Sequence, residues 1–313
     1  MTTTYDYRLR PMTVEDRYEV AELIYASTNA WYVQRGRPPI FQGGPRVAEI
    51  FFDVYHALEP GCAVVAENTR TGTLMGSCFY HPRQHHVSLG IMNVHPNYFG
   101  RGISSALLKH IIDYTDQHGY KALRLTQSAL NLDSYSLYTR AGFVPRQAYQ
   151  DMFLTVPNDG WKKTVPGADR VRPARLGDVS AMAALEMEVS GISREEDYRY
   201  CIANALGFWH VSVIEHPQGG IDGFLIASTH AAMNMLGPGV TRSAEAAAAL
   251  ICRELDQQRG RAPVFLIPVD QEALVRLLYD WGARNCELHF CQVRGAFQPY
   301  RGVNMPSFLP ETG

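Results

Sequence analysis

Two glycines just before a helix are the first residues whose spacing suits chemistry. The segment Val94-His-Pro-Asn-Tyr-Phe-Gly-Arg-Gly-Ile103 follows a β-like run, and an amphipathic helical pattern begins at Ile103. Gly100 and Gly102 allow the backbone to curl so that several N–H groups point at one anion, and the helix N-terminus adds unsatisfied donors. The pattern predicts a pyrophosphate site, with an ordinary tight turn as the alternative. It lacks the spacing of a dinucleotide fold and the Gly-Lys-Ser/Thr of a nucleotide P-loop.

A second group of residues lies about 30 residues further on. It reads Asn131-Leu-Asp-Ser134, then Leu137-Tyr138, then Ala141-Gly142-Phe143. Tyr138 falls on a short predicted helix, and its phenol, with an ordinary pKa of about 10, could act as a proton donor. The alternative for Tyr138 is a half-buried structural tyrosine.

Taken together, the two segments resemble the GNAT superfamily of acetyl-CoA-dependent N-acetyltransferases, over about residues 8–156. The resemblance implies that acetyl-CoA is the cosubstrate and that backbone amides of the first segment hold its pyrophosphate. It implies that Asn131 and Ser134 face the CoA arm and that Tyr138 protonates the CoA thiolate. The residues expected to bind the cosubstrate are Met92, Asn93, Val94, Phe99, Gly100, Arg101, Gly102, Ile103, Ser104, Asn131 and Ser134.

Two positions depart from the family pattern. Phe99 stands where the family usually has Gln or Arg, and Ser104 stands where it has Gly or Ala. Phe99 cannot help to hold phosphate, although Arg101 is close enough to supply charge. Because most phosphate contacts in such a loop come from the backbone, we expect binding to survive.

The general base is not identified by the sequence. With a period of two, the side chains on one face of the strand ending at Val94 contain no good base. Those residues are Ser88, Gly90, Met92 and Val94. His85, His86 and Glu67 lie nearby but fit structural or solvated roles better, and a chain of ordered waters is an adequate alternative.

The acceptor pocket of the family is usually shaped by the first helices, where this chain has Trp31, Tyr32 and Arg35, with Arg37 and Phe41 following. Aromatic and arginine side chains could seat a flat or carboxylate-bearing acceptor. Ordinary packing of these side chains at the surface is an equally good interpretation.

The predicted function is transfer of acetyl to a primary amine of a small molecule. The alternatives are a non-catalytic acyl-CoA-binding sensor or scaffold and a protein or peptide N-acyltransferase.

The chain also repeats itself. Arg10-Pro11 followed by Asp16 recurs as Arg172-Pro173 followed by Asp178, and each Asp is a candidate N-cap of a helix. Further matches pair Gly72–Gly76 with Gly219–Gly223, Pro96 with Pro238, and Gly142 with Gly282. Such ordered landmarks predict duplication of one α+β unit.

We therefore expect two tandem GNAT-like domains of the α+β class, each a mixed, mostly antiparallel sheet flanked by helices. The expected domains are residues 1–156, which carry catalysis, and residues 171–313, a degenerate copy, with a linker at 157–170. In the first, we expect strands near 62–67, 74–80, 87–94 and 122–128, helices at 103–117 and 132–140, and a closing strand pair at 143–147 and 152–156. The copy has lost the cradle glycines, and Leu278 stands at the position of Tyr138.

Composition sets limits on the partners. Hydrophobic residues are 46% of the 313 residues and charged residues 19%, which excludes extended disorder. A net charge of −2 argues against nucleic acid as the main partner. The sequence has no membrane span or secretory signal and no metal-ligand pattern, so a cytoplasmic protein with reduced cysteines is expected. The oligomeric state stays open, a homodimer included.

Overall fold

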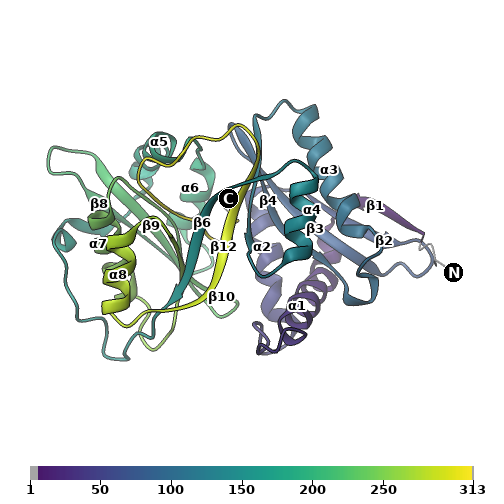
Figure 1. Ribbon diagram of the computed structural model, residues 1–313, viewed down its shortest axis with the longest axis horizontal. Helices are drawn as coiled ribbons and strands as arrows, with labels where there is room; N and C mark the ends of the chain where they lie inside the picture. Colours follow the sequence, from purple (N-terminus) through teal and green to yellow (C-terminus); the bar gives the residue numbers. More distant parts are fainter. Residues whose placement is uncertain (1–5, 312–313) are drawn as a thin grey trace. The chain divides into compact units, whose positions relative to one another are not determined.

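The computed structural model describes residues 6–311, and their contacts form two compact units. Unit 1 holds residues 6–82, 86–123 and 309–311, and unit 2 holds residues 83–85 and 124–308. The fold class is α+β, as expected (Figure 1). These units do not follow the sequence repeat, because the last elements of the N-terminal half belong to unit 2. The domain boundaries at 156 and 170 stay a prediction.

Unit 1 contains an antiparallel sheet in the order β1-β2-β3-β4 (Figure 1). Its elements are β1 Tyr7–Pro11, α1 Arg17–Val33, α2 Glu49–Leu58, β2 Ala63–Asn68, β3 Leu74–Pro82, β4 His86–Val94 and α3 Ile103–Gln117. The expected bounds of α3 are confirmed, and the three strands differ from expectation by only one or two residues at their ends.

The two faces of this sheet carry different helices. Asn93 on β4 donates from Nδ2 to Ser27 Oγ of α1 at 2.7 Å, so this side chain faces α1. Its neighbour Val94 pairs with Gly76, whose missing side chain leaves room for α3. A Cβ on Gly76 would lie 2.9 Å from Ile103 Cγ2 and 3.1 Å from Leu107 Cδ1. Close approach at Gly76 therefore fixes the start of α3 against the sheet.

Unit 2 contains a longer sheet in the order β5-β12-β6-β11-β10-β9-β8-β7, with β13 paired to β10. Strand β5 is Ala122–Ser128, whose first two residues belong to unit 1. The other elements are α4 Leu132–Arg140, β6 Val144–Phe153, β7 Val171–Pro173, α5 Val179–Ser190, α6 Glu195–Ala203, β8 Trp209–Glu215, β9 Ile221–His230, β10 Met233–Thr241, α7 Ala244–Asp256, β11 Val264–Pro268, α8 Glu272–Asp280, β12 Arg284–Gly295 and β13 Val303–Met305. The expected bounds of β5 and α4 are confirmed.

The last strands of the two halves are exchanged. β6 comes from the N-terminal half, yet it pairs with β11 on one edge and with β12 on the other. β12 comes from the C-terminal half and lies between β5 and β6. The expected closing pair at 143–147 and 152–156 is wrong, because β6 is one continuous strand whose partners come from the other half.

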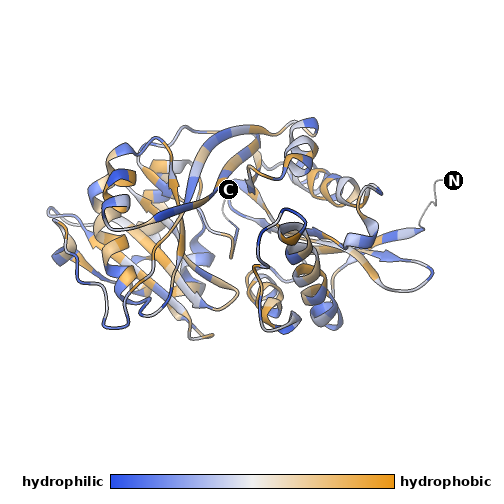
Figure 2. Ribbon diagram, turned by 60° about the horizontal axis from the view of Figure 1, so that its bottom comes forward, coloured by the Kyte–Doolittle hydropathy of each residue, from blue (hydrophilic) through white to orange (hydrophobic). Residues whose placement is uncertain are grey.

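Apolar packing in unit 2 centres on α7 and the strands beneath it. Ala246, Ala247, Ala248 and Ala249 are all buried, and their small side chains let the helix approach the sheet closely. Gly223 on β9 adds to this, because a Cβ there would lie 3.1 Å from Leu250 Cδ1. In Figure 2 several strands beneath the helices of this unit are coloured hydrophobic. Within residues 6–311, no helix is both long enough and apolar enough to cross a bilayer.

The residues predicted as a linker have no helix or strand between 154 and 167, as their composition suggests. They are nevertheless packed against unit 2. The Trp161 amide donates to Asp256 Oδ1 at 3.0 Å, and the Trp161 ring centroid lies 5.7 Å from that of Trp281. Near the other end of the chain, Leu309 and Glu311 are buried in unit 1, where the Glu311 carboxylate accepts a hydrogen bond from the Tyr55 hydroxyl.

The repeat is visible in one ion pair that both halves keep. Arg10 donates to the two carboxylate oxygens of Asp16 at 2.7 and 2.8 Å. Arg172 donates to those of Asp178 at 2.8 and 2.9 Å. Neither carboxylate caps the following helix as expected, because each accepts instead from a backbone amide three residues earlier in the chain. The paired Asp thus tightens the turn that enters the first helix of each half.

Replacing Asp178 with Asn should reduce the free energy of unfolding by about 1 kcal/mol at pH 7, because it breaks a bidentate, partly buried ion pair. The hydrogen bond from Arg172 holds the pKa of Asp178 below its usual value. The stabilisation is therefore complete above about pH 4 and is lost as the pH falls through the lowered pKa. Urea unfolding across this range measures it, with exposed Asp169→Asn as control. A pH-independent difference would contradict the ion-pair explanation.

Candidate functional site

The loop between β4 and α3, residues 95–102, has the backbone that the glycines predict. Gly100 has a φ of 72° and Gly102 a φ of 80°, both in the left-handed region that favours glycine. Gly102 is also the N-cap residue of α3 and has no side chain to accept from the first amides of that helix. The start of α3 therefore offers backbone donors and a positive dipole end to an anion.

The C-terminal half has no such loop. Only residues 242–243 connect β10 to α7, and the Oγ of Ser243 accepts from the Ala246 amide at 3.2 Å. This helix thus caps itself with its own side chain. The sequence match of Pro96 to Pro238 is wrong in structural terms, because Pro96 lies in the loop after β4 whereas Pro238 lies inside β10. The copy has lost the whole loop rather than only its glycines.

The end of β4 carries three of the expected residues, Met92, Asn93 and Val94, all half-buried. The expected alternation along this strand is wrong, because the register with β3 shifts between the pairs Cys78–Met92 and Tyr80–Leu89. The bulge adds one residue to β4, so residues before and after it do not keep a period of two.

The side chains around the two glycines differ in exposure. Phe99 is 44% exposed and Arg101 is also exposed, whereas Ile103 is buried as the first residue of α3. Ser104, in the first turn of the helix, is half-buried. A ligand at this loop would therefore meet the Arg101 side chain and the open backbone together.

Tyr138, Asn131 and Ser134 lie on or beside α4, in unit 2. Tyr138 is 6% exposed, and its ring centroid lies 5.6 Å from that of Phe143. Asn131 is the N-cap of α4, and its Oδ1 accepts from the Ser134 amide at 3.1 Å. The structure thus brings these three residues together on one element and places the glycine loop in the other unit. Leu278 on α8 occupies the position equivalent to Tyr138 and is fully buried.

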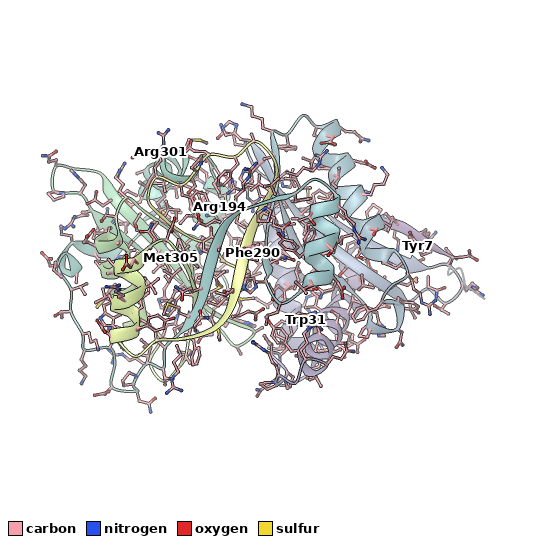
Figure 3. The ribbon with its side chains drawn as sticks, viewed as in Figure 1. Tyr7, Trp31, Arg194, Phe290, Arg301 and Met305 are labelled. Carbon is pink, nitrogen blue, oxygen red and sulfur yellow. The ribbon has the colours of Figure 1, made fainter. Side chains whose placement is uncertain are left out.

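The expected acceptor residues form a cluster near the C-terminal end of α1, where Figure 3 labels Trp31. The rings of Trp31 and Tyr32 meet edge to face, with centroids 4.8 Å apart. The Arg35 guanidinium lies 4.1 Å from the Trp31 ring centroid, in cation–π geometry. The three residues therefore lie together as expected, but the Arg35 guanidinium already packs on the Trp31 ring.

Glu67 is excluded as a base by its partners. Arg8 and Arg10 donate to its carboxylate, and the hydrogen bond from Arg10 lowers the pKa of Glu67.

Sequence reasoning missed a different acid–base pair in unit 2. His289 Nδ1 on β12 lies 2.7 Å from Asp151 Oδ2 on β6, and burial raises the pKa of Asp151. No local pattern could reveal this pair, because it depends on the exchanged strands.

A cavity of about 470 Å³ lies beside the glycine loop within unit 1. Its lining includes His95 and Tyr98 from the loop, and Glu19 and Glu22 from α1. Two carboxylates give this cavity a local negative charge that favours cations. The sequence did not single them out, because glutamates on the outer face of a helix look like ordinary surface residues.

Residues 27–143 match the profile of the Acetyltransferase (GNAT) family, and this span includes the glycine loop, Asn131 and Tyr138. This part of the chain is therefore similar to the GNAT acetyltransferases. The UPF0157 protein YqkA of Bacillus subtilis is 29% identical over 119 residues, a match that covers 37% of this chain and 33% of the Bacillus protein. The matched segment thus spans about a third of the length of that relative.

Solved structures show that the tandem GNAT fold extends over nearly the whole chain. A protein from Pyrococcus horikoshii assigned as an acetyltransferase has a TM-score of 0.73 at 14% identity, covering 99% of this chain and 95% of its own. A GCN5-related N-acetyltransferase from Sphaerobacter thermophilus has a TM-score of 0.63 at 17% identity, covering 94% and 96%. A tandem GNAT protein from the clavulanic acid biosynthesis pathway has a TM-score of 0.59 at 14% identity, covering 93% and 98%.

Replacing Gly102 with Ala in the loop between β4 and α3 should weaken CoA binding at least tenfold, because an L side chain strains the left-handed backbone and projects into the open space before α3. Gly119→Ala is the matched control, since Gly119 ends the same helix with a φ of 70° and equally open space. Both variants should lose about 1 kcal/mol of stability in urea unfolding. Calorimetric titration with CoA then separates them, and equal CoA affinities would contradict the role of the loop.

Proposed function

We propose that the protein transfers acetyl from acetyl-CoA to the primary amine of a small molecule, using one acetyl-CoA site in the N-terminal half. The observation that carries this proposal is the glycine loop that enters α3 without a side-chain cap, inside the segment that matches the GNAT profile. The pyrophosphate of CoA would accept from the first amides of α3, with Arg101 adding positive charge. Met92, Asn93 and Val94 would line the path of the CoA arm, together with Asn131 and Ser134.

The proposed chemistry is direct attack on the thioester. The amine nitrogen forms a bond to the acetyl carbon, the carbon–sulfur bond breaks, and CoA leaves as a thiolate that takes a proton from Tyr138. The attacking amine loses its proton to water or to a base that we do not assign. Tyr138 suits the acid role because a buried phenol stays protonated at neutral pH and is held by helix α4.

An amine acceptor is supported by the charge around the loop. Small amines are cations at neutral pH, and Glu19 and Glu22 line the cavity beside the loop. The cluster of Trp31, Tyr32 and Arg35 would add a flat apolar wall. Because the Arg35 guanidinium packs on Trp31, it holds this wall in place rather than reaching freely for a carboxylate.

The proposal is tested by supplying acetyl-CoA with a panel of small primary amines and amino acids and by measuring release of free thiol. We expect release with at least one amine at well above the rate of hydrolysis without amine. Gly102→Ala should lower this release at fixed acetyl-CoA. Tight binding of acetyl-CoA with no thiol release from any amine would instead identify an acyl-CoA sensor.

Replacing Tyr138 with Phe should lower kcat about 100-fold and leave the dissociation constant of acetyl-CoA nearly unchanged, because only the proton donor is removed. Tyr279→Phe is the matched control, since Tyr279 lies on α8 of the copy, one residue beyond the equivalent position, and its hydroxyl contacts Gln150. Steady-state kinetics with the best amine of the panel measures both variants. An unchanged kcat in Tyr138→Phe would contradict the role of Tyr138 as proton donor.

A further inference from the structure

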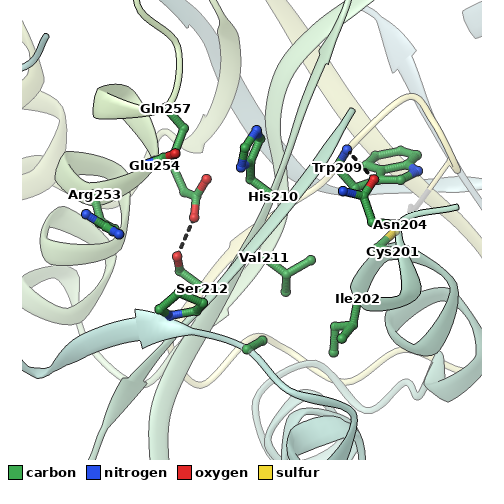
Figure 4. A pocket seen from close by; sticks show the side chains of 12 residues that line it. Cys201, Ile202, Asn204, Trp209, His210, Val211, Ser212, Arg253, Glu254 and Gln257 are labelled. Atoms are coloured by element: carbon green, nitrogen blue, oxygen red, sulfur yellow. Dashed lines mark hydrogen bonds between the residues drawn. The ribbon is translucent and has the colours of Figure 1, made fainter. Parts of the chain in front are cut away.

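A second cavity, of about 220 Å³, lies entirely within unit 2 and is formed by the C-terminal half (Figure 4). Its walls come from the end of β7, the end of α6, the start of β8 and the last turns of α7. None of the residues proposed for acetyl transfer lines it. Ligand cavities for drug-sized molecules span roughly 300–1,000 Å³, so this one suits a molecule no larger than an amino acid.

The cavity contains a buried carboxylate with one unused oxygen. Glu254 on α7 is 1% exposed, and one of its oxygens accepts from the Ser212 hydroxyl of β8 (Figure 4). The other, Oε2, is buried and has no hydrogen-bond partner among the described residues. Burial raises the pKa of Glu254 to about 7, against the opposing effect of the Ser212 hydrogen bond. A buried acceptor without a donor is costly, so a ligand that supplies N–H groups would be stabilised there.

The N-terminal half shows that the fold does not require this polar pair. Gly76 and Gly223 occupy equivalent places, and each makes room for a helix leucine, Leu107 in one half and Leu250 in the other. Four residues further along each helix stand Ile111 and Glu254.

The facing strand changes in the same way. Pro11 pairs with Val64 in the first half, and the equivalent Pro173 pairs with Ser212 in the second. Val64 is buried, as is Ile111 on the facing helix. Positions held by buried aliphatic side chains in one copy are therefore held in the other by the hydrogen-bonded Ser212 and Glu254, which line the cavity.

We propose that this cavity binds a small primary amine as its ammonium ion, with Glu254 Oε2 accepting an N–H and balancing the charge. An ammonium group offers three donors, whereas an anion or an ether offers none to the unused oxygen. This site would be a second ligand site, separate from the acetyl acceptor and independent of CoA.

The other groups around Glu254 are compatible with this ligand. Burial, and then the charge of Arg261, lower the pKa of His210 on β8, so its imidazole is neutral at pH 7 and can also accept. Burial raises the pKa of Cys201 on α6, which keeps it a neutral thiol. Arg253 on α7 is exposed, so solvent screens its repulsion of a cation. Above neutral pH the ionised carboxylate of Glu254 is thus the dominant charge inside the cavity.

The test uses n-butylamine and n-butanol, which have the same carbon chain, in calorimetric titrations of the whole protein without CoA. At pH 8 we expect saturable binding of n-butylamine and none of n-butanol. At pH 5.5 the amine is still an ammonium ion, but Glu254 is protonated, so its affinity should fall at least tenfold. Protonation of His210 at pH 5.5 would also lower the affinity for n-butylamine. Variants of Glu254 are therefore needed to separate its contribution from that of His210.

Glu254→Gln keeps the shape of the side chain and an acceptor for Ser212 but removes the charge. It should lower the n-butylamine affinity at pH 8 at least tenfold and remove most of its pH dependence, whereas Glu196→Gln on the exposed face of α6 should change nothing. Ala174→Leu narrows the cavity without touching the carboxylate and should also weaken binding, which keeps the test decisive if Glu254→Gln fails to fold. Absence of saturable amine binding, or equal binding by Glu254→Gln, would overturn the proposal. Either outcome leaves acetyl transfer untouched, because no readout involves CoA.

Discussion

The exchange of β6 and β12 is the constraint on which unit 2 depends. A strand inside a sheet must find partners on both edges, and β6 finds both of them, β11 and β12, in the C-terminal half. β5 in turn depends on β12, beside which it lies. Removing the C-terminal half would leave β5 and β6 with open edges next to α4, the helix that carries Tyr138. The degenerate copy is therefore needed to complete the sheet that supports a proposed catalytic residue, whether or not it binds a ligand.

Only some parts of the copy are constrained by this structural role, and the other parts can change. The entry turn is under the structural constraint, and it keeps the Arg172–Asp178 pair with nearly the distances of Arg10–Asp16. The connection before α7 is not under this constraint. It consists only of residues 242–243, and the Ser243 side chain caps the helix. An N-terminus that is satisfied by its own side chain no longer presents those donors to a phosphate. The loss of the glycine loop and the retention of the sheet thus have separate physical causes.

Local patterns in the sequence predicted what local interactions decide. The bounds of α3, β5 and α4 and the left-handed glycines followed from periodicity, capping and steric freedom close to each residue. The exchanged strands and the His289–Asp151 pair could not follow, because they join residues more than 110 positions apart. The pattern of apolar and polar residues along each strand would be the same with either set of partners. The bulge in β4 was missed because a single extra residue changes the pairing register but not the composition of the strand. The match of Pro96 to Pro238 failed because a deletion in the connecting loop shifted the alignment there.

The buried carboxylate of Glu254 shows most clearly that the copy has changed by more than loss. Raising the pKa of a carboxyl from 4.5 to about 7 means that ionisation costs about 3 kcal/mol more in the folded protein than in the unfolded chain. This is a large share of the roughly 5–15 kcal/mol that stabilises a typical domain. Val64 and Ile111, both buried at the equivalent positions of the other half, show that this fold accepts aliphatic side chains there. Drift toward stability would favour those residues, so a costly charge beside a cavity is better explained by a ligand that offsets its burial than by the needs of the core.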